Sequence, residues 1–337
     1  MLFEKKYGID IGSSYIRVYS AFRDKLVTDH NMIAYRGHTI LATGSEAYEM
    51  YEKAPADIRI DTPMAFGTIS NRELQEIILY QMMRDQDRFP TRGCRVYFAV
   101  PSDISALERR AYYEVVNGNW IHRTRVFAVE ASLADAIALG LDVDNAAGSM
   151  LVNIGAQRTR FSVLGDGRII MNREFPVGGS QINEGIAQEV RRRYNLVIGQ
   201  KTAARLKLAM GRLYDQRKEA RKVVGLDSVS GLPREEVVSA SVVNAGIMNS
   251  IHDLAEQMKV FFERIPPQAA YTVSKEGIYL TGGSARIPHI DKYLASCTGF
   301  MFNLSELYEG STVRGLQKIM NSRSLSGYAQ AIRMRRL

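Results

Sequence analysis

A tight turn near the start of the chain has residues that could bind an anion. Apolar residues alternate up to Ile11, the run Gly12-Ser13-Ser14 interrupts them, and the alternation resumes after Tyr15. This pattern predicts a strand, a turn and a returning strand. Backbone N–H groups in a turn of glycine and small hydroxyl residues are uncovered, so a phosphate oxygen can reach them. Asp10 could hold a cation such as Mg²⁺ beside that anion, although a plain hairpin would have the same pattern.

Two further glycine turns follow apolar segments later in the chain. Residues 149–164 repeat the order of apolar strand, glycine turn and alternating strand, and Gly282-Gly283 follows the apolar residues 277–281. Two hairpins and a late glycine loop are typical of duplicated halves that close on a nucleotide. The pattern resembles that of the superfamily containing actin, the sugar kinases and the heat-shock chaperone ATPases.

Composition narrows the class of protein. A length of 337 residues predicts two domains, and 46% hydrophobic with 24% charged residues is ordinary for a globular chain. A net charge of +8 favours an acidic partner, such as an anionic membrane surface or a phosphate ligand. Nucleic acid is not expected, because neither a basic platform with aromatic residues nor zinc-ligand spacing is present. The isolated Cys94 and Cys297 predict a reducing cytosol, and we expect neither a signal peptide nor a membrane span.

Periodicity predicts the elements that must position these turns. Strands that alternate with helices predict an α/β fold in which helices cover a sheet. In the first half, Ser45 and Asn71 are the expected N-caps of two helices, and Ser102 or Asp103 begins a third. A helix of small residues, able to pack closely, is expected over residues 131–141. In the second half we expect helices over residues 202–214, 244–263, 288–297 and 314–320, a helix after Gly178-Gly179, strands within 223–238, and a tail over 321–337.

With these elements in order, the chain resembles the MreB rod-shape-determining family, the bacterial actins. The resemblance spans about residues 7–320 and is carried by short pieces in a characteristic order: residues 8–12, 44–50, 100–102, 108–111, 134–141, 177–179, 202–203, Lys207, 280–283 and 314–315. It implies the actin-like ATPase fold, an α/β fold with two large ribonuclease-H-like subdomains around a nucleotide cleft. It also implies a small subdomain inserted into each half.

The resemblance implies these domain boundaries. The first half would be residues 1–147 plus 313–320, with residues 35–67 as its insertion, and the second half residues 148–312, with 184–249 as its insertion. Residues 321–337 would be a basic tail.

The resemblance also assigns residues to an ATP or ADP site with Mg²⁺. The first phosphate loop would be Gly12, Ser13, Ser14 and Tyr15, with Asp10 at the metal. The rest of the site would be Gly155, Ala156, Gln157, Arg158 and Thr159 of the second loop, Gly178 and Gly179, Lys207 beside the nucleoside, and Gly282, Gly283, Ser284, Ala285 and Arg286 beneath it.

Four departures from the family pattern fall within this site. Asn153 stands where the family has an aspartate, and Ala156 and Gln157 bring side chains where bare backbone should approach phosphate. Arg158 could compensate by neutralising phosphate charge directly. The catalytic glutamate of the family aligns with Ala131, and Glu130 is one residue early. The ribose-contacting glutamate aligns with Ala204. The alignment therefore predicts weak or absent ATP hydrolysis, with Glu130 as the remaining candidate acid.

Three functions compete. The first is a filament-forming protein of the MreB type, assembling on the inner face of the cytoplasmic membrane with the cell-wall elongation machinery; Phe89 and residues 331–337 could reach the bilayer. The second is a nucleotide-binding scaffold or adaptor without conventional filaments. The third is a sugar kinase, which is disfavoured because no sugar-binding insertion is evident.

Overall fold

The computed structural model describes residues 5–86, 93–118, 124–214 and 218–332. It contains two compact units. Unit 1 comprises Met1–Asn145, Gly165–Ile169 and Gly310–Leu337, and unit 2 comprises Ala146–Leu164 and Ile170–Glu309. Phe89 and the arginines of residues 333–337, expected to reach a membrane, lie outside the described residues.

The main sheet of unit 1 has the strand order β19-β10-β9-β1-β2-β3. Its strands are β1 (Lys6–Ile11), β2 (Tyr15–Ser20), β3 (Lys25–His30), β9 (Arg95–Val100), β10 (Arg125–Glu130) and β19 (Gln330–Ala331). β1, β9 and β10 are parallel, whereas β1-β2 and β2-β3 form antiparallel hairpins. The first hairpin predicted from the sequence is therefore confirmed.

The helices of unit 1 pack on this sheet. They are α1 (Gly44–Met50), α2 (Arg72–Gln86), α3 (Ala106–Val116), α4 (Ala131–Leu139) and α10 (Ser311–Asn321), with the 3-10 helix η3 (Ser324–Tyr328). The apolar residues that alternate along β1 and β2 face the buried side of α2 and α3, and Ile9, Ile16 and Val18 have no exposed surface. This burial is the physical reason for the period-two pattern in the sequence.

Two predicted helix starts are wrong. Ser45 lies inside α1, where its N–H and hydroxyl donate to Asp29 and do not cap the helix. The helix expected from Ser102 begins at Ala106, because Ser105 and Glu108 form a capping box in which each side chain satisfies the other's backbone N–H. Asn71 is confirmed as a cap, since its side chain accepts from Leu74 N at 3.1 Å.

Smaller sheets complete unit 1. A sheet with the order β5-β4-β6 contains β4 (Ile33–Arg36), β5 (Thr39–Thr43) and β6 (Arg59–Asp61), and a hairpin contains β7 (Met64–Ala65) and β8 (Thr68–Ile69). The described part of the predicted tail is not free: it includes η3 and β19, which pairs antiparallel with β10, and Ile332 packs against the core.

Unit 2 repeats the hairpin arrangement. Its main sheet has the order β13-β12-β11-β17-β18, formed by β11 (Ser149–Ile154), β12 (Thr159–Gly165), β13 (Arg168–Phe175), β17 (Ile278–Thr281) and β18 (Phe302–Leu304). β11 and β12 form an antiparallel hairpin, and β17 runs parallel to β11. The second predicted hairpin is confirmed. A smaller sheet has the order β14-β15-β16, with β14 (Leu196–Val197), β15 (Ala220–Asp227) and β16 (Pro233–Ser239).

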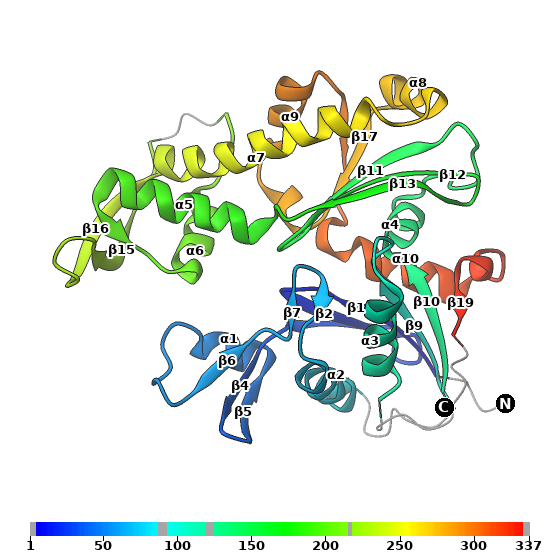
Figure 1. Cartoon of the computed structure of the whole chain (residues 1–337), viewed down its shortest axis with the longest axis horizontal. Coiled ribbons are helices and arrows are strands. Elements are labelled where there is room, and N and C mark those ends of the chain that lie inside the picture. Colours follow the sequence, from blue (N-terminus) through cyan, green and yellow to red (C-terminus); the bar gives the residue numbers. More distant parts are fainter. Residues whose placement is uncertain (1–4, 87–92, 119–123, 215–217, 333–337) are drawn as a thin grey trace. The chain divides into compact units, whose positions relative to one another are not determined.

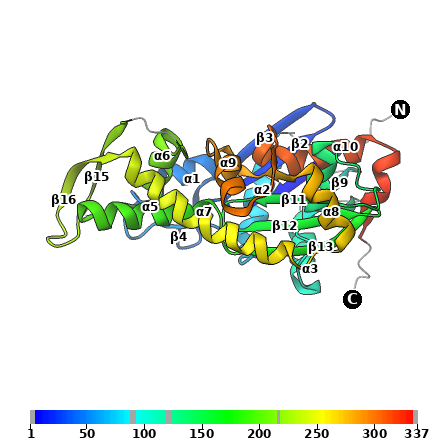
Figure 2. The ribbon, with the colours of Figure 1, turned by 90° about the horizontal axis from the view of Figure 1, so that it is seen from above.

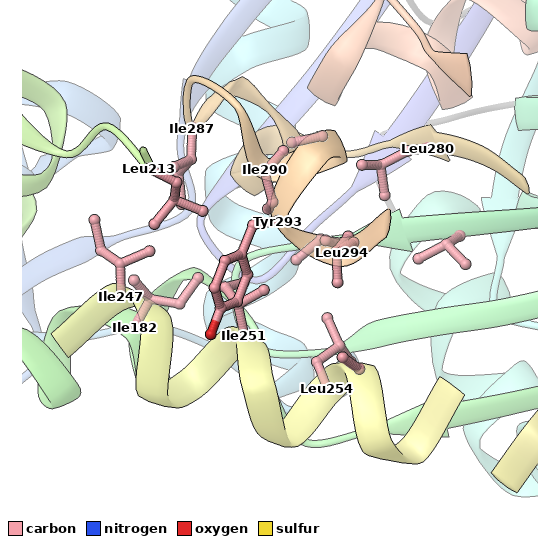
Figure 3. Packing of buried hydrophobic residues seen from close by; sticks show 14 of the residues in the cluster. Ile182, Leu213, Ile247, Ile251, Leu254, Leu280, Ile287, Ile290, Tyr293 and Leu294 are labelled. Atoms are coloured by element: carbon pink, nitrogen blue, oxygen red, sulfur yellow. The ribbon is translucent and has the colours of Figure 1, made fainter. Parts of the chain in front are cut away.

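Long helices cover the sheet of unit 2. They are α5 (Gly179–Tyr194), α6 (Gln200–Met210), α7 (Ala240–Phe262), α8 (Pro267–Glu276) and α9 (Ile290–Thr298), with 3-10 helices η1 (Gly283–Arg286) and η2 (Tyr308–Gly310). α5 and α7 run side by side (Figures 1 and 2), and a Cβ on Gly185 would lie 2.8 Å from Gly246 O, so glycine permits their close approach. Figure 3 shows Ile247 and Leu254 of α7 facing the residues of α9 and β17 that complete the core.

Among the described residues, no helix has both the length and the apolar character needed to cross a bilayer.

Candidate functional site

The β1-β2 turn of unit 1 is held closed from behind. Gly12 N donates to Tyr15 O at 2.9 Å, and a Cβ on Gly12 would lie 2.9 Å from that same oxygen. Asn31 fixes the turn, because its Nδ2 donates to Gly12 O and its backbone N donates to Ser14 O, both at 2.9 Å. The buried Asn31 also exchanges two hydrogen bonds with Gln75 of α2. The carbonyl oxygens of Gly12 and Ser14 therefore already accept hydrogen bonds from Asn31.

Backbone N–H groups on the opposite side of this turn are available as hydrogen-bond donors. Within the described part of the chain, the N–H groups of Ser13 and Ser14 have no protein acceptor. The Ser13 hydroxyl accepts from Gly67 N at 3.3 Å, and Gly67 O in turn accepts from the Tyr112 hydroxyl at 2.8 Å. Adjacent backbone N–H groups with no acceptor form a concave anion site. The geometry fits the phosphate-binding role predicted for Gly12, Ser13, Ser14 and Tyr15.

Asp10 lies beside a buried arginine. Its Oδ2 is 3.4 Å from Arg17 Nη1, and Arg17 as a whole is 7% exposed. Asp10 and Arg17 are opposite one another in the β1-β2 ladder, so their side chains leave the same face of the sheet. The ring of Tyr15 lies 5.6 Å from the Arg17 guanidinium and 4.4 Å from the ring of His30. The positive charge beside Asp10 is therefore the guanidinium of Arg17.

The β11-β12 turn of unit 2 has the same geometry. Gly155 N donates to Arg158 O at 2.9 Å, and a Cβ on Gly155 would again lie 2.9 Å from that oxygen. The carbonyls are held by the N-terminus of α5, since Gly179 N donates to Gly155 O and Ser180 N donates to Ala156 O. A Cβ on Gly178 would lie 2.8 Å from Gly155 O, so only glycine permits this approach.

Lys207 and Ser284 form hydrogen bonds with residues at this turn. Ser284 Oγ donates to Gly155 O at 3.2 Å, and Lys207 Nζ donates to Gly179 O at 2.9 Å. A Cβ on Gly179 would lie 3.1 Å from Ser284 Oγ and 3.4 Å from Lys207 Nζ. The second turn, Gly178 and Gly179, Lys207 and the start of η1 are therefore brought together within unit 2, as their predicted roles require.

Lys207 is partly buried, and no acidic side chain among the described residues pairs with it. Its partial burial lowers the pKa of its amine to about 8, because the charged form loses hydration. An ammonium in this position, which donates to a backbone carbonyl, would be stabilised by an anionic ligand.

Arg158 does not have the role expected for it. Its Nη1 donates to Glu174 Oε2 at 2.5 Å, while Arg160 Nε donates to Glu174 Oε1 at 2.8 Å. Burial raises the pKa of Glu174, whose side chain is 7% exposed, but the two arginines prevail and the net shift is downward. Arg158 is thus committed to a structural ion pair and does not compensate directly for Ala156 and Gln157. Thr159 is likewise internal, since its buried hydroxyl donates to Val177 O at 2.6 Å.

The loop after β17 is fixed by its glycine and by an ion pair. Gly282 has φ of +95°, and a Cβ there would lie 2.4 Å from Ile154 O, so the position requires glycine. Gly283, Ser284, Ala285 and Arg286 then form η1. Arg286 makes a bidentate pair with Glu309 at 2.6 and 3.0 Å, and this pairing raises the pKa of its guanidinium. The guanidinium also lies 4.5 Å from the centroid of the Tyr308 ring. Arg286 therefore orders the loop.

The catalytic acid remains a prediction. Glu130 ends β10 and occupies the N-cap position of α4, with φ −66° and ψ 127°, and its side chain caps no N–H. Ala131 and Ser132, which align with the family's catalytic position, are the first residues of α4, and Ser132 is fully buried. Ala204 lies in α6, three residues before Lys207, and provides no carboxylate.

Mg²⁺ beside a nucleotide is usually held by one or two carboxylates together with phosphates and water, so Asp10 stays a predicted metal residue. No group of three or more His, Cys, Asp or Glu side chains among the described residues could hold a metal ion. Of the predicted site residues near the two turns, Asp10 has a carboxylate but lies beside Arg17, and the matching position of β11 is Asn153.

Sequence reasoning missed three residues of this site: Arg17, Asn31 and Glu174. A signal for Arg17 was present, because the sequence places arginine seven residues after Asp10 and again seven residues after Asn153. A tight hairpin sets each pair opposite one another. Asn31 and Glu174 follow their hairpins in the sequence and had no comparable signal.

Two glycine-turn hairpins on α/β sheets, each with its small inserted sheet, define an actin-like fold. A family model described as MreB/Mbl protein matches residues 4–326. The chain is 28% identical over 315 residues to the cell shape-determining protein MreB of Escherichia coli (strain K12), covering 90% of each, and 26% identical over 301 residues to Mbl of Bacillus subtilis (strain 168), covering 87% of this chain and 89% of Mbl. The chain belongs to the MreB/Mbl family.

Solved structures agree on the fold. MreB5 of Spiroplasma citri, crystallised with AMPPNP, matches with a TM-score of 0.88 and 25% identity, covering 97% of this chain and 98% of that one. The MamK double helical filament matches with a TM-score of 0.77 at 18% identity, covering 95% and 99%. The predicted family and fold class are confirmed.

Proposed function

We propose that this chain binds ATP or ADP and assembles into MreB-type filaments that organise cell shape. The observation that carries the proposal is the matched pair of turns, in which Gly12 N–Tyr15 O and Gly155 N–Arg158 O are both 2.9 Å. In each unit the carbonyls of the turn accept hydrogen bonds from within that unit, and in unit 1 the N–H groups of Ser13 and Ser14 are left as donors for phosphate. MreB5, whose structures contain AMPPNP or ADP, supports the choice of nucleotide.

The remaining predicted residues would complete the nucleotide site. Lys207 and the loop of residues 282–286 would contact the nucleotide in unit 2, since the partly buried amine of Lys207 lies beside Gly179. Magnesium would arrive with the phosphates and would supply charge neutralisation. Isothermal titration at millimolar nucleotide tests the proposal, and absence of heat with both ATP and ADP contradicts it.

Assembly on the inner face of the cytoplasmic membrane, with the cell-wall elongation machinery as partner, completes the proposal. The family membership supports it, and so do the net charge of +8 and the three arginines among residues 331–337. Each basic residue near an anionic leaflet contributes about 1 kcal/mol, so three give a marginal anchor alone.

Filaments should therefore appear with ATP and should lie on anionic vesicles. We expect electron microscopy to show filaments with ATP, and vesicles of anionic lipid to recruit them at low salt. Deleting residues 322–337 would also remove β19 from the sheet edge, so the matched variant replaces only Arg333, Arg335 and Arg336 by glutamine. Vesicle binding should fall in that variant while filaments persist. ATP binding without filaments under any condition would favour the alternative, a nucleotide-binding scaffold.

Hydrolysis of ATP is expected to be very slow. Phosphoryl transfer needs an oriented water and neutralised phosphate charge, and Ala131 lacks the carboxylate that the aligned family position carries. Loss of a general base typically reduces the rate by about 100-fold or more. Phosphate release from assembled protein should therefore be near background and unchanged by Glu130→Ala. A rate comparable to ordinary bacterial actins that Glu130→Ala abolishes would instead identify Glu130 as the catalytic acid.

A further inference from the structure

We infer that Arg17 is a phosphate-binding residue of the first turn, supplying from the chain itself the positive charge otherwise expected of a metal at Asp10. The inference rests on the proposed nucleotide binding and deepens it. It concerns unit 1 alone, and its observations are the burial of Arg17, its position in the hairpin and the contrast with unit 2.

Arg17 is largely buried and makes a single, long ion pair. The residue is 7% exposed, and its only polar contact among the described residues is the 3.4 Å contact with Asp10. A guanidinium has five N–H donors, so most donors of Arg17 have no acceptor within the described part of the chain. No nitrogen of Arg17 is among the fully buried side-chain atoms that lack a partner, so the donors that Asp10 leaves free are open to a ligand. Such a cation is suited to a ligand that brings negative oxygens.

The second hairpin provides an internal comparison. Arg160 pairs with Asn153 in the β11-β12 ladder as Arg17 pairs with Asp10 in β1-β2. Arg160 has a short 2.8 Å hydrogen bond to Glu174 of β13, and Arg158 shares that carboxylate. In the first hairpin, the β3 residue opposite Arg17 is Thr28, which has no charge. Arg160 of unit 2 therefore has a short hydrogen bond to a carboxylate, whereas Arg17 of unit 1 has only the 3.4 Å contact with Asp10 among the described residues.

The position of Arg17 matches the donors of the turn. Arg17 follows Tyr15 by two residues, or about 7 Å along the strand, which an arginine side chain can span. Its guanidinium lies 5.6 Å from the centroid of the ring of Tyr15, the first residue of β2 after the turn. A phosphate held by the N–H groups of Ser13 and Ser14 would find a planar pair of donors there, the geometry in which arginine binds phosphate best. Asp10 would then orient Arg17, its carboxylate holding the guanidinium as Glu174 holds Arg160.

The test measures ATP affinity by titration in magnesium buffer and in EDTA, with the full chain. Arg17→Gln should weaken ATP binding at least tenfold in both buffers, because a charge-assisted hydrogen bond is lost. Arg17→Lys, which keeps the charge and loses the fork, should weaken it less. The matched control is Arg72→Gln, which removes an exposed arginine paired with Glu114 of the same unit and should leave the affinity unchanged.

Asp10→Asn separates the arginine from a metal site. If Arg17 supplies the charge, wild type and Asp10→Asn should both retain ATP in EDTA, since Asp10 only orients the guanidinium and the phosphate still pairs with it. If Asp10 instead holds a metal, ATP binding should fall steeply in EDTA and in Asp10→Asn while Arg17→Lys binds normally, and that result overturns the inference.

Two further results are decisive. Unchanged ATP affinity in a folded Arg17→Gln, with wild type binding, overturns the inference and leaves the proposed nucleotide binding intact. Should Arg17→Gln fail to fold, Arg17→Lys decides, because wild-type affinity in that variant in both buffers also overturns it. No ATP binding by wild type overturns the proposed function itself.

Discussion

Replacing Gly315 with alanine should lower the free energy of unfolding by about 2–3 kcal/mol, a large share of a typical domain's stability. Gly315 lies on α10, where a Cβ would be 1.9 Å from Ala134 O and 2.7 Å from Ala134 Cα. Both obstacles are backbone atoms of α4, so no rotamer change can relieve the clash and the helices must separate. The better helix propensity of alanine offsets about 1 kcal/mol of the cost.

Separation of these helices would break polar contacts as well. The buried Asp135 of α4 accepts from Ser311 Oγ at 2.9 Å and from Thr312 Oγ1 at 2.7 Å, and Lys318 Nζ donates to the last carbonyls of α4. A polar group left buried without its partner costs about 1–3 kcal/mol. Larger side chains at residue 315 should therefore prevent folding of unit 1.

The matched control is Gly310→Ala, at the start of the same helix, where a Cβ would have no neighbour within 4 Å. We expect its stability to stay within about 0.5 kcal/mol of wild type. Urea titration followed by circular dichroism measures both variants. Equal stability of Gly315→Ala and Gly310→Ala would mean that α4 and α10 do not pack as described.

Sequence patterns predicted the hairpins and several helices, because these elements depend on residues that are close together in the sequence. Alternating apolar residues on both sides of Gly12 and of Gly155 predicted the two hairpins, since one face of each strand is buried. The small residues of 131–141 predicted a closely packed helix, and α4 ends at Leu139 with Gly140 in the left-handed conformation as its C-cap. The partner of that helix, α10, is distant in the sequence and no local pattern could identify it.

Competition between neighbouring polar groups explains the predictions that failed. Ser45 was expected to cap a helix, but the carboxylate of Asp29 takes its donors. Arg158 was expected to face phosphate, but Glu174 is reached across a hairpin whose exact register the sequence did not specify. In both cases the side chain binds a carboxylate that is distant in the sequence and does not make the local interaction predicted for it. Gly178, Gly179, Lys207 and Ser284 nevertheless meet at the turn of Gly155, because the glycines permit the close backbone approach there.

Lys207→Met should stabilise the protein and weaken nucleotide binding at the same time. Burial lowers the pKa of Lys207 to about 8, from 10.5, so the charged amine is destabilised in the folded state at neutral pH. One pKa unit corresponds to about 1.4 kcal/mol, which makes this cost about 3 kcal/mol at pH 7. Methionine has a similar unbranched stem without charge and should recover part of that cost. ATP affinity should fall about tenfold or more, because the partly buried cation beside Gly179 is lost.

The pH dependence of stability identifies the amine as the cause. Between pH 8 and pH 10.5 the unfolded chain binds a proton that folded Lys207 does not, so wild-type stability should rise relative to the variant by up to about 1.4 kcal/mol per pH unit. Below pH 8 the difference between wild type and Lys207→Met should be constant. The control is Lys259→Met, an exposed lysine paired with Glu256, which should show no such slope. Parallel stability curves for wild type and Lys207→Met from pH 7 to 10 would mean that Lys207 is not a partly buried, unpaired cation. If nucleotide stabilises the charged amine, saturating ATP should raise its pKa and shift the onset of the slope to higher pH.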